Sequence, residues 1–151
     1  MSFEVRPAGE DEAEEIVPLY EWLFAPPGST PPAWDPERAA ERLRSAIAGE
    51  GSTILLAADG ERLVGICSAY IDLLSVRFGL RCWVEDLAVD PERRSEGIGA
   101  ALLAAAREWA AAEGASHLEL DSGIARPDAH RFYEREGAVW PSKSFTWLLG
   151  E

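Results

Sequence analysis

The chain has 151 residues, the length of one domain, and its 47% hydrophobic residues are enough to build an ordinary core. Its 27 acidic and 14 basic residues give a formal net charge of −13, which disfavours binding to a nucleic-acid backbone or an anionic membrane surface. The N-terminus lacks the apolar centre of a signal peptide, and no apolar run approaches a membrane span, so we expect a soluble cytoplasmic protein.

The sequence of the first third of the chain predicts a strand and two helices. Residues 2–8 alternate between polar and apolar as a strand does, and residues 9–24 have the apolar spacing of one helix. A proline-rich loop follows over residues 25–37, and residues 36–51 predict a second helix that ends at one of its two closing glycines.

Three strand-like runs form the middle of the chain. Residues 52–60 and 62–74 are joined by an Asp-Gly turn, which is typical of a hairpin, and residues 80–89 form a third run. We therefore predict an antiparallel meander. Residues 97–113 then show helical spacing and end at Gly114, a glycine in the position of a C-terminal cap.

The last part of the chain predicts a short strand over residues 116–122, a short helix over 126–137 and a closing strand over 142–149. The two cysteines, Cys67 and Cys82, lie in strand-like runs, and we interpret them as small buried hydrophobes rather than a disulfide. The two histidines and two cysteines of the chain do not have the spacing of metal ligands, so we expect no metal.

A basic and glycine-rich turn precedes the helix over 97–113. Its sequence, RRSEGIGAALL over Arg93–Leu103, suits an anion, because backbone N–H groups at a helix start are unpaired and glycines allow close approach. A phosphate-binding P-loop is excluded by Gly99–Ala101, where a Gly-Lys-Ser/Thr ending is required. A dinucleotide site is weakened by Leu102 in place of a third glycine, but Asp121 stands about where a ribose-binding acid belongs, so this alternative stays open.

Two linked motifs resemble one known family. RSEGIGA, residues 94–100, fits the R/Q-x-x-G-x-G/A signature of the GNAT superfamily of acyl-CoA-dependent N-acyltransferases, and DAHRFYEREGA, residues 128–138, resembles its second block. The resemblance covers residues 83–138 in motif detail. It implies an α/β (α+β) fold in a single domain, residues 1–151, with a mixed, mostly antiparallel central sheet flanked by helices.

The same resemblance implies acetyl-CoA as co-substrate. The pyrophosphate would lie on the turn made by Arg94, Ser95, Glu96, Gly97, Ile98, Gly99 and Ala100. The pantetheine arm would pair, like an added strand, with Leu87, Ala88 and Val89, where family members have a bulge and a splayed neighbouring strand. Arg126 stands where many members carry an asparagine and is a further candidate contact. Glu96 departs from the family pattern, since an acid beside a pyrophosphate needs Arg93 or Arg94 to offset it.

The resemblance also supplies candidates for acid–base chemistry. Glu85 occupies the place of the acid that some polyamine-type members use through an ordered water, and we take it as the general base. Asp86, its neighbour, is expected on the opposite face of the strand with a structural role. Tyr133 is the candidate general acid for the leaving thiolate, whereas His130 is interpreted as a surface or cofactor-lip residue.

In the family, the first two helices and the end of the central hairpin usually form the substrate pocket. Here that region holds aromatic and acidic side chains suited to a cationic amine: Tyr20, Trp22, Phe24, Trp34 and Asp72. Of these, Trp22, Phe24 and Asp72 are our candidates for binding a small-molecule or peptide amine. The sequence leaves the amine's identity and a homodimer open. A catalytically silent acyl-CoA-binding or interaction module with the same fold is the alternative to an N-acetyltransferase.

Overall fold

The computed structural model describes residues 2–123 and 126–149. Contacts divide the chain into two compact units, residues 1–120 and residues 121–151. In the part of the chain that is described, no helix combines the length and the apolar character that crossing a membrane requires.

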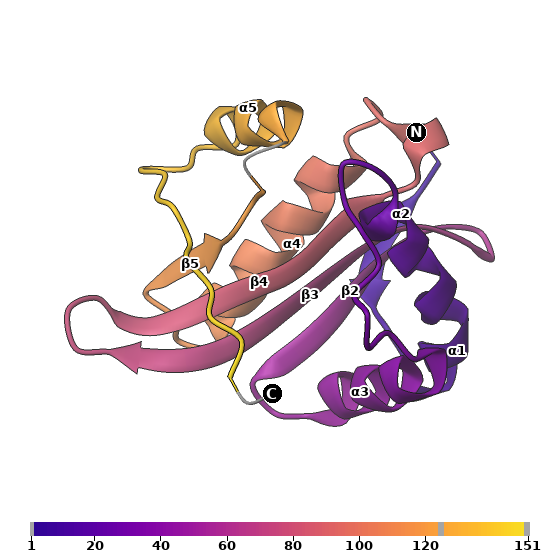
Figure 1. Cartoon of the computed structure of the whole chain (residues 1–151), viewed down its shortest axis with the longest axis horizontal. Helices are drawn as coiled ribbons and strands as arrows, with labels where there is room; N and C mark the ends of the chain where they lie inside the picture. Colours follow the sequence, from indigo (N-terminus) through magenta and orange to yellow (C-terminus); the bar gives the residue numbers. More distant parts are fainter. Residues whose placement is uncertain (1, 124–125, 150–151) are drawn as a thin grey trace. The chain divides into compact units, whose positions relative to one another are not determined.

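The larger unit is built on one five-stranded sheet whose strands lie in chain order (Figure 1). The strands are β1 (Glu4–Pro7), β2 (Ser52–Asp59), β3 (Arg62–Ser75), β4 (Gly79–Val89) and β5 (His117–Leu120). The first four pair antiparallel, and β5 pairs parallel to β4. The predicted meander and the mixed, mostly antiparallel sheet are confirmed.

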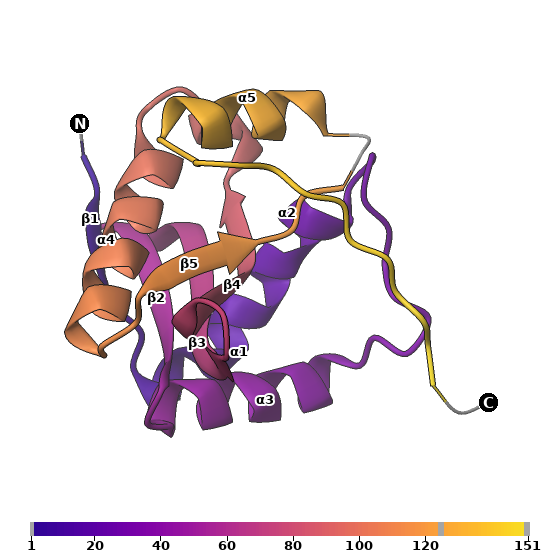
Figure 2. The ribbon, with the colours of Figure 1, turned by 90° about the vertical axis from the view of Figure 1, so that its left-hand side faces the viewer.

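Two layers of helix cover the sheet. Figure 2 shows α4 (Ile98–Ala112) on one side of the sheet, and α3 (Pro36–Ala48) with the N-terminal helical segments on the other. Each layer has its own hydrophobic core, one around Ile16, Leu43 and Ile66 and the other around Val64, Cys67 and Leu102. Both cysteines are buried, as the sequence predicts, and burial raises the pKa of Cys67 to about 12 and that of Cys82 to about 11.

The single helix expected over residues 9–24 is replaced by a chain of short segments. They are η1 (Glu10–Glu12), α1 (Ala13–Ile16), η2 (Val17–Tyr20) and α2 (Glu21–Phe24). Pro18 lies at the start of η2, where it removes a backbone donor and its ring crowds the preceding turn, so one continuous α-helix cannot pass through it. The apolar face survives the interruption, because Ile16 and Leu19 are both buried.

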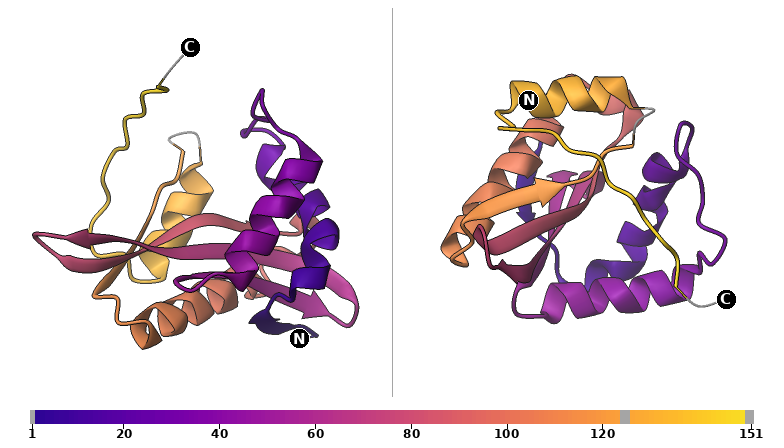
Figure 3. Two further views of the ribbon diagram at one scale, coloured as in Figure 1. Left: turned by 90° about the horizontal axis from the view of Figure 1, so that it is seen from below. Right: turned by 60° about the vertical axis from the view of Figure 1, so that its left-hand side comes forward.

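The β3–β4 hairpin extends beyond the rest of the sheet (Figure 3). Several large apolar side chains near its tip are exposed: Leu73, Leu74, Val76 and Phe78. At the other end of β4, the short 3-10 helix η3 (Pro91–Arg93) leads into the turn before α4.

The smaller unit contains α5 (Pro127–Arg135), which confirms the helix predicted there. The closing strand predicted over residues 142–149 is wrong: these residues have no regular secondary structure, and their large apolar side chains, such as Phe145 and Trp147, are exposed. A strand-like composition produces a strand only where a partner takes up the backbone hydrogen bonds, and residues 121–123 and 126–149 contain no other strand.

Candidate active site

A bulge in β4 decides where its two acids point. Trp83 lies opposite Tyr70, Val84 opposite Ala69, and then Asp86 opposite Ser68, so Glu85 is one extra residue in the strand. Inserting one residue resets the alternation of side chains.

Glu85 and Asp86 therefore share one face of the sheet, and the expectation that they point to opposite faces is wrong. The Oε1 atom of Glu85 accepts a hydrogen bond from Trp83 Nε1 at 2.7 Å, and Trp83 pairs with Tyr70, which packs against the core on the α3 side. The Oδ2 atom of Asp86 accepts a hydrogen bond from the Tyr20 hydroxyl at 2.8 Å, on the same side.

Beyond the bulge, β4 loses its neighbour on one side. β5 pairs with β4 only over Arg81–Val84, whereas Leu87, Ala88 and Val89 pair with β3 on the opposite edge. Among the described strands, none takes up the other edge of β4 at these three residues. An open strand edge offers backbone donors and acceptors to an extended ligand.

The turn that follows β4 has an unusual backbone. Ser95 has φ of 67° and Gly97 has φ of 83°, both in the left-handed region. Glycine adopts this conformation freely, whereas for a residue with a Cβ it costs about 1–2 kcal/mol. The turn ends where α4 begins at Ile98, so the first backbone N–H groups of a 15-residue helix lie here and attract an anion.

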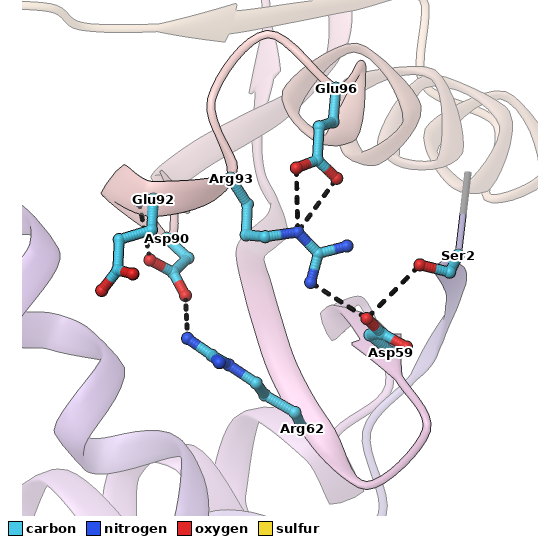
Figure 4. A network of polar contacts seen from close by, with 7 residues as sticks. All are labelled: Ser2, Asp59, Arg62, Asp90, Glu92, Arg93 and Glu96. Carbon is cyan, nitrogen blue, oxygen red and sulfur yellow. Dashed lines mark hydrogen bonds and ion pairs between the residues drawn. The ribbon is translucent and has the colours of Figure 1, made fainter.

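A polar network fastens this turn to the β2–β3 hairpin (Figure 4). Arg93 Nε donates to both carboxylate oxygens of Glu96 at 2.9 and 3.0 Å, and Arg93 Nη1 donates to Asp59 Oδ2 at 3.0 Å. Arg62 Nη2 donates to Asp90 Oδ2 at 2.7 Å, while the other oxygen of Asp90 accepts from the Glu92 backbone N–H. Of the two arginines expected to offset Glu96, Arg93 makes the contact and Arg94 is exposed.

Three aromatic rings gather beside the two acids. Tyr20 lies 5.6 Å from Trp34 and 6.3 Å from Phe24, and Phe24 meets Trp34 edge-on at 4.8 Å between ring centroids. The Tyr20 hydroxyl bonds to Asp86, so this aromatic cluster of Tyr20, Phe24 and Trp34 is tied to β4.

The other two substrate candidates have partners elsewhere. Trp22 is half-buried and packs against the core on the α3 side. Asp72 lies in the β3–β4 hairpin, where its two oxygens accept hydrogen bonds from Arg81 at 3.0 and 2.8 Å. Sequence reasoning missed the bond between Tyr20 and Asp86, because no local pattern signals a contact across 66 residues.

The surroundings of Asp86 shift the pKa of its carboxyl group. Asp86 is half-buried, and the loss of solvation raises the pKa of its carboxyl group. Hydrogen bonds from the hydroxyl groups of Ser68 and Tyr20 lower that pKa in part. Ser68 Oγ donates to Asp86 Oδ2 at 2.7 Å and accepts from the Asp86 backbone N–H at 3.0 Å. Burial and the nearby Asp86 also raise the pKa of Tyr20.

The smaller unit carries the remaining candidates. Tyr133 lies on α5 with its ring 5.3 Å from that of Phe132, and Arg126 stands at the start of the same helix. A ring nitrogen of His130, Nε2, lies 2.9 Å from the Gly123 carbonyl oxygen. In the described parts of both units, no group of three or more His, Cys, Asp or Glu residues is arranged to hold a metal ion.

The sequence model of the acetyltransferase (GNAT) family matches residues 16–138. The chain belongs to this family. It is an acetyl-CoA-dependent N-acetyltransferase, as the motifs in its turn and in its C-terminal helix predict.

Named relatives of this GNAT enzyme agree with that assignment. It is 32% identical over 99 residues to the uncharacterised N-acetyltransferase YhdJ of Bacillus subtilis, a match that covers 66% of this chain and 69% of YhdJ. Over 66 residues it is 50% identical to an aminoalkylphosphonate N-acetyltransferase of Salmonella typhimurium, covering 44% and 43% of the two chains.

Solved structures show the same GNAT fold. The aminoglycoside N-acetyltransferase AAC(6')-Iy in complex with CoA has a TM-score of 0.83 at 15% identity, covering 97% of this chain and 94% of that one. The aminoglycoside acetyltransferase meta-AAC0020, from an uncultured soil metagenomic sample, has a TM-score of 0.76 at 17% identity, covering 99% and 97%.

Proposed function

We propose that this N-acetyltransferase moves the acetyl group of acetyl-CoA to the primary amine of a small cationic molecule by direct attack. The observation that carries the proposal is the bulge at Glu85. It places an exposed carboxylate directly before the stretch of β4 whose edge is open, so one short segment offers both a binding edge and a base.

Two segments of the chain are suited to hold acetyl-CoA. The open edge at Leu87, Ala88 and Val89 suits the amide groups of the pantetheine arm. The turn and first residues of α4, Arg94–Ala100, suit the pyrophosphate, because they combine helix-start amides with two left-handed residues that shape the backbone. We include Arg126 of the smaller unit as a further contact to the cofactor.

Glu85 is the proposed general base, acting through a water molecule. A primary amine with a pKa of about 10.4 is protonated at pH 7, and freeing its lone pair costs roughly 4.6 kcal/mol. Glu85, through the water, takes up that proton and so frees the lone pair, and the nitrogen then forms its bond to the acetyl carbon. The second proton that the nitrogen loses on becoming an amide balances the proton given to the leaving thiolate. A base in this role contributes a factor of about 10² to 10⁴ in rate. Asp86, on the same face, adds negative charge that attracts the ammonium form of the substrate.

Tyr133 is the proposed general acid. When the bond between the acetyl carbon and sulfur breaks, the electron pair leaves with the sulfur as a thiolate. A phenol donates its proton, or a hydrogen bond, to that thiolate and so stabilises the leaving group.

The substrate class follows from the aromatic cluster of Tyr20, Phe24 and Trp34. Ring faces attract a cation, and the cluster is bonded to a carboxylate, Asp86. Phe24 ranks first among our substrate candidates because it belongs to this cluster, whereas Trp22 packs against the core and Asp72 is bonded to Arg81. Aminoglycosides, which the name of one similar enzyme mentions, are cationic amines and should head the panel. Aminoalkylphosphonates, which the name of another mentions, carry an anionic phosphonate beside the amine and test whether a net positive charge is required.

The first test is calorimetric titration with acetyl-CoA, CoA and NAD, followed by thiol release across an amine panel. We expect binding of acetyl-CoA and CoA but not NAD, and turnover of at least one amine. Absence of acetyl-CoA binding at millimolar concentration would refute the proposal. Binding without turnover of any amine would favour a silent acyl-CoA-binding module.

The roles of the two catalytic candidates are tested separately. Glu85→Gln should lower the rate and remove the limb of the pH–rate profile that reports the base. The matched control is Glu119→Gln, which removes another half-exposed carboxylate from the neighbouring strand β5 and should leave that limb in place. Tyr133→Phe should lower turnover while CoA affinity stays nearly constant; unchanged turnover would remove Tyr133 as the acid.

A further inference from the structure

The turn that we propose for the pyrophosphate contains an acid of its own. Glu96 stands between Ser95 and Gly97, the two residues with left-handed backbone. A free carboxylate there would repel the negatively charged pyrophosphate at short range. The binding site therefore requires something that removes the charge of Glu96 from the path of the ligand.

Arg93 has the geometry for this task. Its Nε lies 2.9 and 3.0 Å from the two oxygens of Glu96, so the carboxylate is held from one side by a cation. The side chain of Arg93 is only 17% exposed, whereas Arg94 is an exposed residue. The guanidinium group of Arg93 is thus bonded to carboxylates of the protein, and Arg94 is the arginine of the pair that faces solvent.

The same side chain anchors the turn to the sheet. Arg93 Nη1 donates to Asp59 Oδ2 at 3.0 Å, and Asp59 is the last residue of β2, next to the β2–β3 turn (Figure 4). Arg93 and Glu96 lie on either side of Ser95. Among the described residues other than glycine, Ser95 is the one with a left-handed backbone. The contact between them closes the turn around this strained residue, which is held in place only if its surroundings fix it.

We propose that Arg93 is a positioning residue for acetyl-CoA: it binds Glu96 and Asp59 at once, and so keeps the carboxylate away from the backbone amides of residues 94–100 and fixes the turn against the β2–β3 hairpin. This inference rests on the proposed binding of the pyrophosphate at that turn. In this arrangement Arg93 acts through Glu96 and Asp59, and the backbone amides of residues 94–100 make the direct contact with the pyrophosphate.

The central experiment uses two acetyl donors. Arg93→Met should raise the KM for acetyl-CoA about tenfold, which corresponds to ~1.4 kcal/mol. The KM for the amine should stay within about twofold, because the aromatic cluster lies on another part of the fold. With S-acetylpantetheine, which lacks the pyrophosphate, Arg93→Met and the wild type should perform alike.

A second substitution tests the charge argument. In the double variant Arg93→Met/Glu96→Gln, no uncompensated carboxylate remains in the turn, so most of the acetyl-CoA affinity should return. Arg62→Met is the matched control: it also removes an arginine that ties this region to the β2–β3 hairpin, but its partner is Asp90. It should lower thermal stability and leave the KM for acetyl-CoA unchanged.

The outcomes separate this inference from the proposed function. If the wild type does not bind CoA, both are overturned. If the wild type binds CoA and Arg93→Met binds it equally well, only the inference is overturned. Equal losses with acetyl-CoA and S-acetylpantetheine would make Arg93 purely structural, and a double variant as weak as Arg93→Met would contradict the neutralisation of Glu96.

Discussion

Gly65, near the start of β3, sets how closely α4 approaches the sheet. A Cβ added at this position would lie 2.8 Å from Leu102 Cδ1 and 2.9 Å from Ile98 Cγ2. Carbon atoms in ordinary contact are ~3.5–4.0 Å apart, so Gly65→Ala must push the first turns of α4 outward by roughly 0.5–1 Å. Both side chains are buried, which leaves them little room to rotate away.

These contacts give the expected change in the free energy of unfolding for Gly65→Ala. Overpacking a core costs about 1–3 kcal/mol, and replacing glycine in a strand returns about 0.5–1 kcal/mol. We expect Gly65→Ala to lower the free energy of unfolding by about 1–2 kcal/mol and the melting temperature by roughly 2–8 °C. Because Ile98 begins α4, the displacement reaches the turn proposed to hold the pyrophosphate, and the KM for acetyl-CoA should rise several-fold.

Thermal unfolding and acetyl-CoA titration together test this reasoning. The matched control is Gly114→Ala at the far end of α4, where φ is 90° and no atom lies within 4 Å of the added Cβ. It should cost about 1 kcal/mol through backbone strain without moving the start of the helix. If Gly65→Ala weakens acetyl-CoA binding no more than Gly114→Ala does, the close approach of α4 does not control the turn.

Three further predictions concern charged groups. Hydrogen bonds from Arg6 and from the Gly9 backbone lower the pKa of Glu12 to about 2 from 4.5, so Glu12 stabilises the fold above pH 4.5 and the gain is lost as the pH falls towards 2. Glu12→Gln should therefore cost about 1–2 kcal/mol at pH 7 after allowance for solvent screening, and the melting curves of the two proteins should converge in acid; parallel curves at all pH values would contradict this. Burial raises the pKa of Asp86, which makes its charged form destabilising, so Asp86→Asn should melt at a higher temperature than the wild type at neutral pH, with the difference shrinking as the pH is lowered. Tyr20→Phe removes a hydroxyl group that lowers the pKa of Asp86, and carboxyl-carbon NMR titration should find that pKa higher than in the wild type; an unchanged value would mean that the bond is absent in solution.

Sequence patterns predicted those elements whose structure depends only on residues close together in the chain. The turn over residues 94–100 was recognisable because glycine spacing and the start of a helix follow directly from neighbouring residues. The meander over β2, β3 and β4 was equally readable, since alternation and an Asp-Gly turn specify a hairpin without help from the rest of the chain. In the N-terminal segment, by contrast, apolar spacing predicted one helix but gave no weight to Pro18, which interrupts it.

By itself, then, the sequence determined the antiparallel meander, the helix that follows it and the family motifs, because each depends on periodicity or on residues adjacent along the chain. Tertiary structure alone decided that Glu85 and Asp86 share a face, since a bulge is a property of the register between two strands. It also decided the partners of two further residues: Tyr20 reaches Asp86 and Arg93 reaches Asp59 across 66 and 34 residues. Such contacts exist only once the sheet has brought distant segments together, and no pattern along the chain encodes them.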